Sequence, residues 1–486
     1  MRRWQVFSMV WVLVAGCYEL PVDEPTGEED GEVSEQAAST WEVCGNTAFP
    51  VGPAPIDSLE GLAVMGRARG NLLFGADDGT TGSELWRSSG TRGDGTWLVR
   101  DLAPGAGGSR PLEFVRVGDR VFFTANDPRY GRELFVSDGT RWGTRLVRDI
   151  WPGAMGSFPS SLFAYNGLLY FAAADPARGR ELWRSDGTPY GTVLVRDLEA
   201  GVEGSSPDQF VRGGDGALYF IAHVRTFFTR VMRSDGRYFF TEVLRIPTER
   251  GIQPPLVAVG RRVLFFVGGV HGEDGPHDGP GELLATDGGA PPVRLGRFVQ
   301  YHALAVMGGR LFFSAIQELG SHDAELWVSD GTPGGTRRLK DVRSGPEGSN
   351  PDGFAVLGRQ LFFTADDGQS GNELWVSDGT EAGTRLFADL EPGAAGSSPK
   401  ALAAWRGHLF FSAETAGHGR EPWVSDGTPS GTRALDPLAP GALSSNPKGF
   451  MRSGGDVFFV AEDGANGRGL YAVPLRPDGR CERVGR

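Results

Sequence analysis

A motif that reads ELWVSDGT in its clearest copies recurs nine times along this chain, about every 48 residues. The clearest copies begin at Glu133, Glu181, Glu325, Glu373 and Glu421, and the looser ones at Glu84, Arg230, Glu282 and Gly469. A repeat of this period indicates stacked copies of one supersecondary unit, because a single unit cannot bury its apolar face alone. The period therefore restricts the architecture before the chemistry of any single residue is considered.

One repeat, residues 353–400, contains four short runs of aliphatic and aromatic residues separated by Gly, Asp, Ser and Pro. Runs of this kind are typical of strands, and the short connections predict antiparallel hairpins. Four antiparallel strands in 40 to 50 residues are the content of one propeller blade. We therefore predict an all-β fold with a single β-propeller of nine four-stranded blades over residues 41–486. Eight blades remain the alternative if one irregular repeat does not form a blade.

The second strand of most repeats carries two adjacent bulky residues. Neighbouring residues in a strand point to opposite faces, so both faces of this strand must be covered, as they are between two blades. The pairs are Phe122-Phe123, Tyr170-Phe171, Tyr219-Phe220, Phe265-Phe266, Phe312-Phe313, Phe362-Phe363, Phe410-Phe411 and Phe458-Phe459.

The N-terminal segment predicts export. Residues 1–16 carry two arginines and then an apolar run, as secretory signal peptides do, and the run ends in Val-Ala-Gly before Cys17. This ending resembles a bacterial lipobox, which implies that Cys17 is lipidated; an ordinary signal peptide is the alternative. Residues 17–40 hold eight acidic and no basic side chains, so we expect a disordered tether. We expect an exported protein, lipid-anchored at the outer membrane or cell surface.

The remaining cysteines predict how the ring closes. With Cys17 modified, Cys44 and Cys481 are left near the two ends of the repeat region. The segment before the first repeat resembles a fourth strand that could join the last blade. Because an exported protein permits a disulfide, we predict a Cys44–Cys481 bond at this joint.

The recurring polar residues are interpreted as structural. The motif aspartates fit a tight turn in which the carboxylate caps backbone N–H groups and the glycine takes a positive φ. A ring of calcium sites is the alternative, but one carboxylate per turn supplies few of the oxygens calcium needs. The motif glutamates are expected to pair with arginines such as Arg148 or Arg196, and the tryptophans to lie in the blade cores. The turn residues are Asp138, Asp186, Asp235, Asp287, Asp330, Asp378 and Asp426.

One loop departs from the repeat and carries metal-binding residue types. Its candidate zinc ligands are His271, Glu273, Asp274, His277 and Asp278. A solvated acidic loop is the alternative. The chain shows no serine-elbow, P-loop or HExxH pattern, so we assign no catalytic residue and expect no cofactor apart from a possible calcium or zinc ion.

From about Leu59 to Val473 the repeats resemble the bacterial ELWxxDGT repeat proteins, a family whose members are exported and built of propeller-like repeats. The net charge of −13 argues against a nucleic-acid partner, since phosphate binding needs a positive surface. We therefore expect a monomeric, lipid-anchored cell-surface propeller that is a non-catalytic binding scaffold for a glycan, peptide or protein, and that contacts the membrane through its anchor only. The alternatives are a polysaccharide hydrolase or lyase with a site at the propeller channel, and a purely structural envelope protein.

Overall fold

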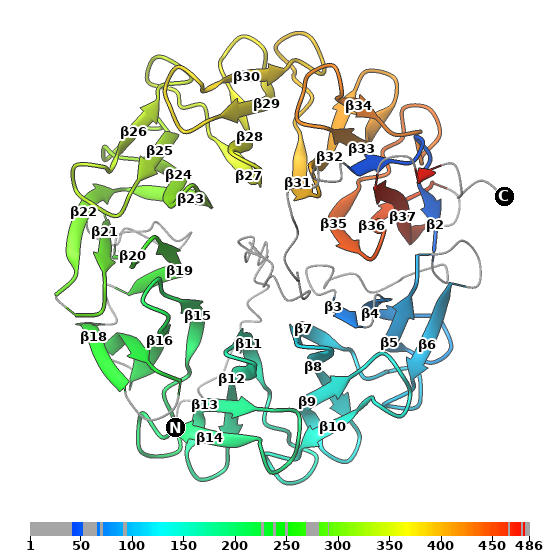
Figure 1. Ribbon diagram of the computed structural model, residues 1–486, viewed down its shortest axis with the longest axis vertical. Coiled ribbons are helices and arrows are strands. Elements are labelled where there is room, and N and C mark those ends of the chain that lie inside the picture. The colour runs from blue at the N-terminus through cyan, green and yellow to red at the C-terminus, as the bar shows by residue number, and fades with distance from the viewer. Residues whose placement is uncertain are drawn as a thin grey trace, which may run out of the picture.

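The computed structural model describes residues 41–51, 66–68, 71–90, 95–224, 228–236, 240–247, 251–268, 281–289, 291–464, 467–477 and 480–481. These residues form nine antiparallel sheets arranged as a ring (Figure 1). The prediction of a nine-bladed, all-β propeller is therefore confirmed, and the three loosest motif copies form third strands like the others.

Blades 1 to 8 each have four strands in chain order, with the first strand nearest the axis of the ring and the fourth at the circumference (Figure 1). Blades 1 to 4 consist of β3 (Gly66–Ala68), β4 (Asn71–Asp77), β5 (Ser83–Ser88) and β6 (Thr96–Arg100); β7 (Leu112–Val117), β8 (Arg120–Asp127), β9 (Gly131–Ser137) and β10 (Arg145–Arg148); β11 (Ser160–Tyr165), β12 (Leu168–Asp175), β13 (Gly179–Ser185) and β14 (Val193–Arg196); and β15 (Asp208–Arg212), β16 (Leu218–Val224), β17 (Phe228–Ser234) and β18 (Phe240–Pro247).

The remaining blades follow the same order around the ring, and only blade 9 takes its fourth strand from the other end of the chain. Blades 5 to 9 consist of β19 (Ile252–Val259), β20 (Arg262–Val267), β21 (Gly281–Thr286) and β22 (Val293–Phe298); β23 (Gln300–Met307), β24 (Arg310–Ile316), β25 (Glu325–Ser329) and β26 (Arg337–Lys340); β27 (Asp352–Leu357), β28 (Gln360–Asp366), β29 (Asn372–Ser377) and β30 (Arg385–Ala388); β31 (Lys400–Trp405), β32 (His408–Thr415), β33 (Gly419–Ser425) and β34 (Arg433–Ala434); and β35 (Lys448–Ser453), β36 (Asp456–Glu462), β37 (Arg468–Pro477), β1 (Trp41–Val43) and β2 (Phe49–Pro50).

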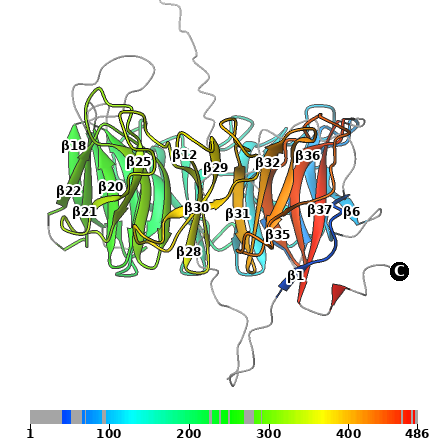
Figure 2. The same ribbon diagram turned by 90° about the horizontal axis from the view of Figure 1, so that it is seen from above.

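The antiparallel order gives the ring two different faces, which lie above and below the strands in Figure 2. We define the turn face by the hairpins that join first to second and third to fourth strands, such as residues 118–119 and 138–144. The loop face carries the hairpins between second and third strands and the connections to the next blade, such as residues 101–111.

The core lies between neighbouring blades, as the paired aromatic residues of the second strands predict. Phe122 and Phe123 are 1% and 0% exposed although they point to opposite faces of β8. Phe122 packs with blade 3, whereas Phe123 packs with residues of blade 1. Because each sheet is covered on both sides, the ring has a series of cores between blades and no single central core.

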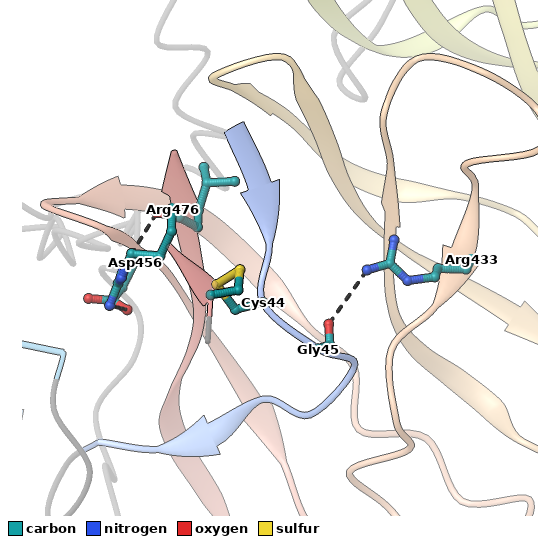
Figure 3. The surroundings of a disulfide bond; sticks show 7 residues. Cys44, Gly45, Arg433, Asp456 and Arg476 are labelled. Carbon is teal, nitrogen blue, oxygen red and sulfur yellow. Dashed lines mark hydrogen bonds and ion pairs between the residues drawn. A yellow bond between two sulfur atoms is a disulfide. The ribbon is translucent and has the colours of Figure 1, made fainter. Parts of the chain in front are cut away.

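The ring is closed by the N-terminal segment (Figure 3). Strands β1 and β2 both pair with β37, with Val43 opposite Leu475 and Phe49 opposite Ala472. A disulfide joins Cys44 to Cys481, as predicted. Arg433 of blade 8 donates hydrogen bonds to the Gly45 carbonyl at 3.5 Å and to Asn46 Oδ1 at 2.8 Å, and Figure 3 shows the first of these beside the disulfide. Both ends of the repeat region are thus fixed in the last blade.

Candidate functional site

A pocket of about 400 Å³ lies at the joint between blades 1 and 2. Residues from the two outer strands β5 and β6 form one wall, and the turn between β9 and β10 forms the other. The lining residues are Arg87, Trp97, Leu98, Val99, Arg100, Asp101, Gly139, Thr140 and Arg141. A volume of this size is within the range of small-ligand sites, about 300–1,000 Å³.

Two arginines of blade 1 hold this pocket together by reaching to the hairpin of blade 2. Arg87 Nη1 donates to the Gly139 carbonyl at 2.9 Å, and Arg100 Nη1 donates to the Thr144 carbonyl at 2.6 Å. The guanidinium of Arg87 also lies over the Trp97 ring, 5.0 Å from its centroid, within cation–π range. The walls are therefore fixed relative to each other by contacts between the two blades.

The pocket departs from the repeat at one pair of facing positions. Strand register places Arg87 opposite Trp97 in blade 1. The regular blades instead place valine opposite arginine, as in Val376 opposite Arg385 and Val424 opposite Arg433. Because blade 1 has an aromatic residue on the outer strand, Trp97 is 43% exposed at the pocket wall. The sequence contains Trp97 as a departure from the repeat, but its position opposite Arg87 becomes visible only once the strand register is known.

The pocket is positively charged in an acidic protein. Three arginines and one aspartate line it, whereas the whole chain has a net charge of −13. Arg141 and Asp101 are exposed, and Arg87 and Arg100 each keep guanidinium N–H groups beyond the one bond described above. Arginine forks match planar anions such as carboxylates. The arrangement can therefore hold an anionic group next to an aromatic face.

The predicted turn aspartates lie in the hairpins between third and fourth strands. Asp138 Oδ1 accepts hydrogen bonds from the Thr140 N–H at 2.9 Å and from the Thr140 hydroxyl at 2.6 Å. A Cβ at Gly143 would come within 1.9 Å of the same carboxylate, so the second glycine of the motif is required. The equivalent bond to a threonine N–H occurs at Asp186, Asp330, Asp378 and Asp426, and Asp287 caps the Gly289 N–H; Asp235 stands in the corresponding turn of blade 4.

These hairpins also join neighbouring blades. Arg145 donates to the Gly187 carbonyl at 2.7 Å, and Arg310 donates to the Gly379 carbonyl at 2.9 Å. These two turns thus accept an arginine from the blade before them, as Gly139 does from Arg87. The SDGT element is explained by these bonds without a bound ion.

Among the motif glutamates that we predicted to pair with arginines, Glu282 of blade 5 does so, with Arg294 and Arg297 each at 3.3 Å, whereas those of six other blades do not. Glu133 is fully buried and accepts hydrogen bonds from the Trp151 N–H at 3.1 Å, the Ser157 N–H at 2.9 Å and the Ser157 hydroxyl at 2.5 Å. Arg148 instead donates to the Thr192 carbonyl of the next blade at 2.6 Å, and Arg196 lies over the Phe240 ring. For these blades the prediction was wrong because the connection to the next blade supplies its own donors, and arginine is not needed.

The same arrangement recurs in six blades, at Glu84, Glu133, Glu181, Glu325, Glu373 and Glu421. Each glutamate binds the serine near the end of the connection to the next blade and so fixes that connection. Burial raises the pKa of Glu133 to about 7, and the hydrogen bonds from Ser157 and Trp151 oppose this increase. Burial also raises the pKa of Glu325 and Glu373.

The candidate zinc ligands His271, Glu273, Asp274, His277 and Asp278 lie outside the described residues, and so does Cys17. One other acidic cluster lies within the described part of the chain, where ligand atoms of Asp323, Glu325 and Asp341 approach within 4.8 Å of one another. Arg338 lies 2.6 Å from Asp323 and 3.8 Å from Asp341, and Glu325 accepts its bonds from the interblade connection. The guanidinium of Arg338 therefore already supplies the positive charge that pairs with the two aspartates of this cluster.

A Ser–His pair in blade 6 has the residue types of a hydrolase but not the access. Ser314 Oγ lies 3.1 Å from His302 Nε2. Burial lowers the pKa of His302, and the charge of Asp352 opposes this effect. Ser314 is 0% exposed, so a substrate carbonyl cannot reach it. At the equivalent position Ser412 donates to the Lys400 carbonyl, which shows that this hydroxyl normally bonds the innermost strand.

Neither a family model nor a curated protein matches this chain. Among solved structures, similar chains include a prolyl endopeptidase (15% identity, TM-score 0.38), a puromycin hydrolase (17%, 0.38) and the acylaminoacyl peptidase of Pyrococcus horikoshii (12%, 0.36). The alignments cover 72%, 72% and 67% of this chain and 52%, 58% and 52% of those chains. This chain thus spans little more than half the length of those proteins.

These comparisons correct our functional prediction. We expected a lipid-anchored, non-catalytic binding scaffold. The similar chains are instead peptidases and hydrolases, so we do not retain the non-catalytic scaffold role; the comparisons do not bear on the lipid anchor. At TM-scores of 0.36–0.38 and 12–17% identity, the likeness transfers no catalytic residue. In the part of the chain that the structure describes, no helix is long and apolar enough to cross a membrane.

Proposed function

We propose that this propeller acts in peptide processing, by selecting peptides through the pocket between blades 1 and 2. The observation that carries the proposal is the combination of three arginines with the exposed face of Trp97 in one pocket. In this proposal, Arg141 and its neighbours hold the C-terminal carboxylate of the peptide, and Trp97 packs against its last side chain.

The charge of the pocket favours a carboxylate. A charge-assisted hydrogen bond from arginine contributes about 1.5–3 kcal/mol, more than a neutral one. Arg141 is exposed on the hairpin of blade 2 and is free of the bridging role that Arg87 and Arg100 have. It is therefore the side chain best placed to turn toward an incoming anion.

The strand that lines the pocket favours an extended peptide over other anions. Five consecutive lining residues, 97–101, belong to β6 or follow it directly. β6 is the last strand of its sheet, so its outer edge has no partner strand among the described residues. An exposed strand edge presents backbone N–H and C=O groups with which an extended peptide can pair.

Binding of labelled pentapeptides to the full chain, measured by fluorescence anisotropy, tests this recognition. A peptide with an aromatic last residue and a free carboxylate should bind at least about tenfold more tightly than its amidated form, as loss of one charged hydrogen bond predicts. Arg141→Ala should abolish this preference. Arg385→Ala, an exposed arginine on the fourth strand of blade 7, is the matched control. Equal binding of the two peptides would refute the proposal.

Processing is tested separately from binding. The same peptides are incubated with an envelope fraction of the source cells lacking this protein, to which the wild-type chain or the Arg141→Ala variant is added, and cleavage is followed by mass spectrometry. We expect the wild-type chain to accelerate cleavage of free-carboxylate peptides and the variant not to do so. Binding without any change in cleavage would leave recognition intact and exclude the processing role.

We also propose that the protein is exported and anchored through a lipid on Cys17, as its N-terminal sequence suggests. Metabolic labelling with a radioactive fatty acid should mark the wild-type chain but not a Cys17→Ser variant. Label that persists in the variant would refute this site of attachment.

A further inference from the structure

Two aromatic side chains project from equivalent positions on neighbouring blades. Trp142 is 90% exposed in the hairpin between β9 and β10, and Tyr190 is 95% exposed in the hairpin between β13 and β14. The equivalent residues of blades 6, 7 and 8 are Gly334, Ala382 and Ser430. Exposed aromatic rings at equivalent hairpin tips of adjacent blades can form part of one contact surface, although other apolar residues, such as Met155 and Val202, are exposed on the loop face.

These aromatic residues lie on the face of the ring at which the described chain enters. Trp41, the first residue of β1, pairs with Pro477 at the end of β37. The same end of the sheet contains Asp456, which starts β36 directly after a hairpin of the turn face. The N-terminal segment therefore joins the ring on the turn face, together with the hairpins that carry Trp142 and Tyr190.

We propose that the turn face of blades 2 and 3 docks on a lipid bilayer surface, with Trp142 and Tyr190 inserted at the level of the headgroups. Tryptophan and tyrosine favour this zone because each ring has an apolar body and a polar group. The proposal rests on anchoring at Cys17 only for the direction from which the membrane approaches. A tether of 24 residues reaches at most about 80–86 Å, so the ring can approach the bilayer closely.

The fold makes this docking compatible with the rest of the hairpin. The Asp138 carboxylate accepts a hydrogen bond from the Thr140 hydroxyl, and the Asp186 carboxylate, although exposed, accepts one from the Thr188 hydroxyl. The residue beside Trp142 is Arg141, which the proposed function assigns to the peptide carboxylate, and the residue beside Tyr190 is the neutral Pro189. From Thr140 to Thr144 and from Thr188 to Thr192, the two hairpins contain no acidic residue beside either ring.

The test couples the full chain to vesicles at a defined point. Cys44 and Cys481 form a disulfide, so Cys17 is the one free thiol among the three cysteines. The chain, with Trp4 and Trp11 of the apolar N-terminal run replaced by phenylalanine, is attached through Cys17 to phosphatidylcholine vesicles that contain a maleimide lipid, and tryptophan quenching by brominated acyl chains is measured. Coupling in this way makes the result independent of whether cells attach a lipid at Cys17.

We expect bromine-dependent quenching in the wild-type chain and loss of most of it in Trp142→Phe. Trp151→Phe, in the connection on the loop face, should leave the quenching unchanged. Trp142→Ala combined with Tyr190→Ala should release the ring, seen as faster rotation of the coupled protein. Absence of quenching, or quenching lost only in Trp151→Phe, would overturn the proposal.

Discussion

Blades 2 and 3 are built like blades 7 and 8 but present a different surface. Glu133 of blade 2 and Glu373 of blade 7 bind the same serine of the following connection, Ser157 and Ser397. At the tip of the hairpin, however, blade 2 exposes Trp142 where blade 7 has Ala382. The buried polar residues of the repeat therefore serve the fold throughout the ring. We call blades 2 and 3 one arc and blades 7 and 8 the other; function is to be sought where exposed positions differ between these two arcs.

The largest effect should come from opening the ring that the two arcs share. The disulfide spans 437 residues, so Cys481→Ser should lower the free energy of unfolding by about 5 kcal/mol through the added freedom of the unfolded chain. Urea unfolding measures the loss, and hydrogen exchange should show it equally in β9 and β29. Cys17→Ser is the control and should have no effect. A loss confined to blades 9 and 1 would show that the arcs are stable independently.

Removal of the buried glutamate should weaken both arcs by a similar amount. Glu133→Ala and Glu373→Ala each leave buried donors without an acceptor, which should cost about 2–4 kcal/mol of unfolding free energy. Glu381→Ala, at an exposed position in a hairpin of blade 7, should cost little. Chemical denaturation of the three variants makes the comparison. A large loss in one arc only would mean that the repeat is not equivalent in the two.

The pH dependence of stability should reveal the glutamate of blade 2. Its pKa is about 7 in the folded chain against 4.5 for the free side chain, because burial disfavours the charged form. The stabilisation that protonated Glu133 gives the folded chain is complete below the free pKa of 4.5, and it is lost as the pH rises through the folded pKa of about 7. The unfolding free energy of the wild type should therefore fall, relative to Glu133→Gln, by at most about 3 kcal/mol over this interval. Parallel pH profiles of the two proteins would contradict the shifted pKa.

The sequence predicted the architecture well because its signals are local. The period, the adjacent aromatic pairs such as Phe122-Phe123, and the two cysteines near the ends were sufficient for nine blades and their closure. The partner of Glu133 was not predictable in the same way, since two of its three donors are backbone N–H groups of a distant connection. Trp97 could be read as a departure from the repeat, but its neighbours in the pocket follow from strand register and from the arginines between blades.

The smallest effect should come from exchanging the exposed residues that distinguish the arcs. Trp142→Ala and Ala382→Trp transfer the aromatic residue from blade 2 to the same position of blade 7, where Ala382 is exposed. Neither hairpin buries this side chain, so each change should alter the unfolding free energy by less than about 0.5 kcal/mol. Thermal unfolding of both variants measures this. If Ala382→Trp destabilises the protein markedly, the hairpin of blade 7 excludes an aromatic residue for structural reasons. The difference between the hairpin tips of blades 2 and 7 would then say less about function. A neutral result means that the hairpin tip is free to vary, so the aromatic residues at the hairpin tips of blades 2 and 3 require an explanation outside the fold.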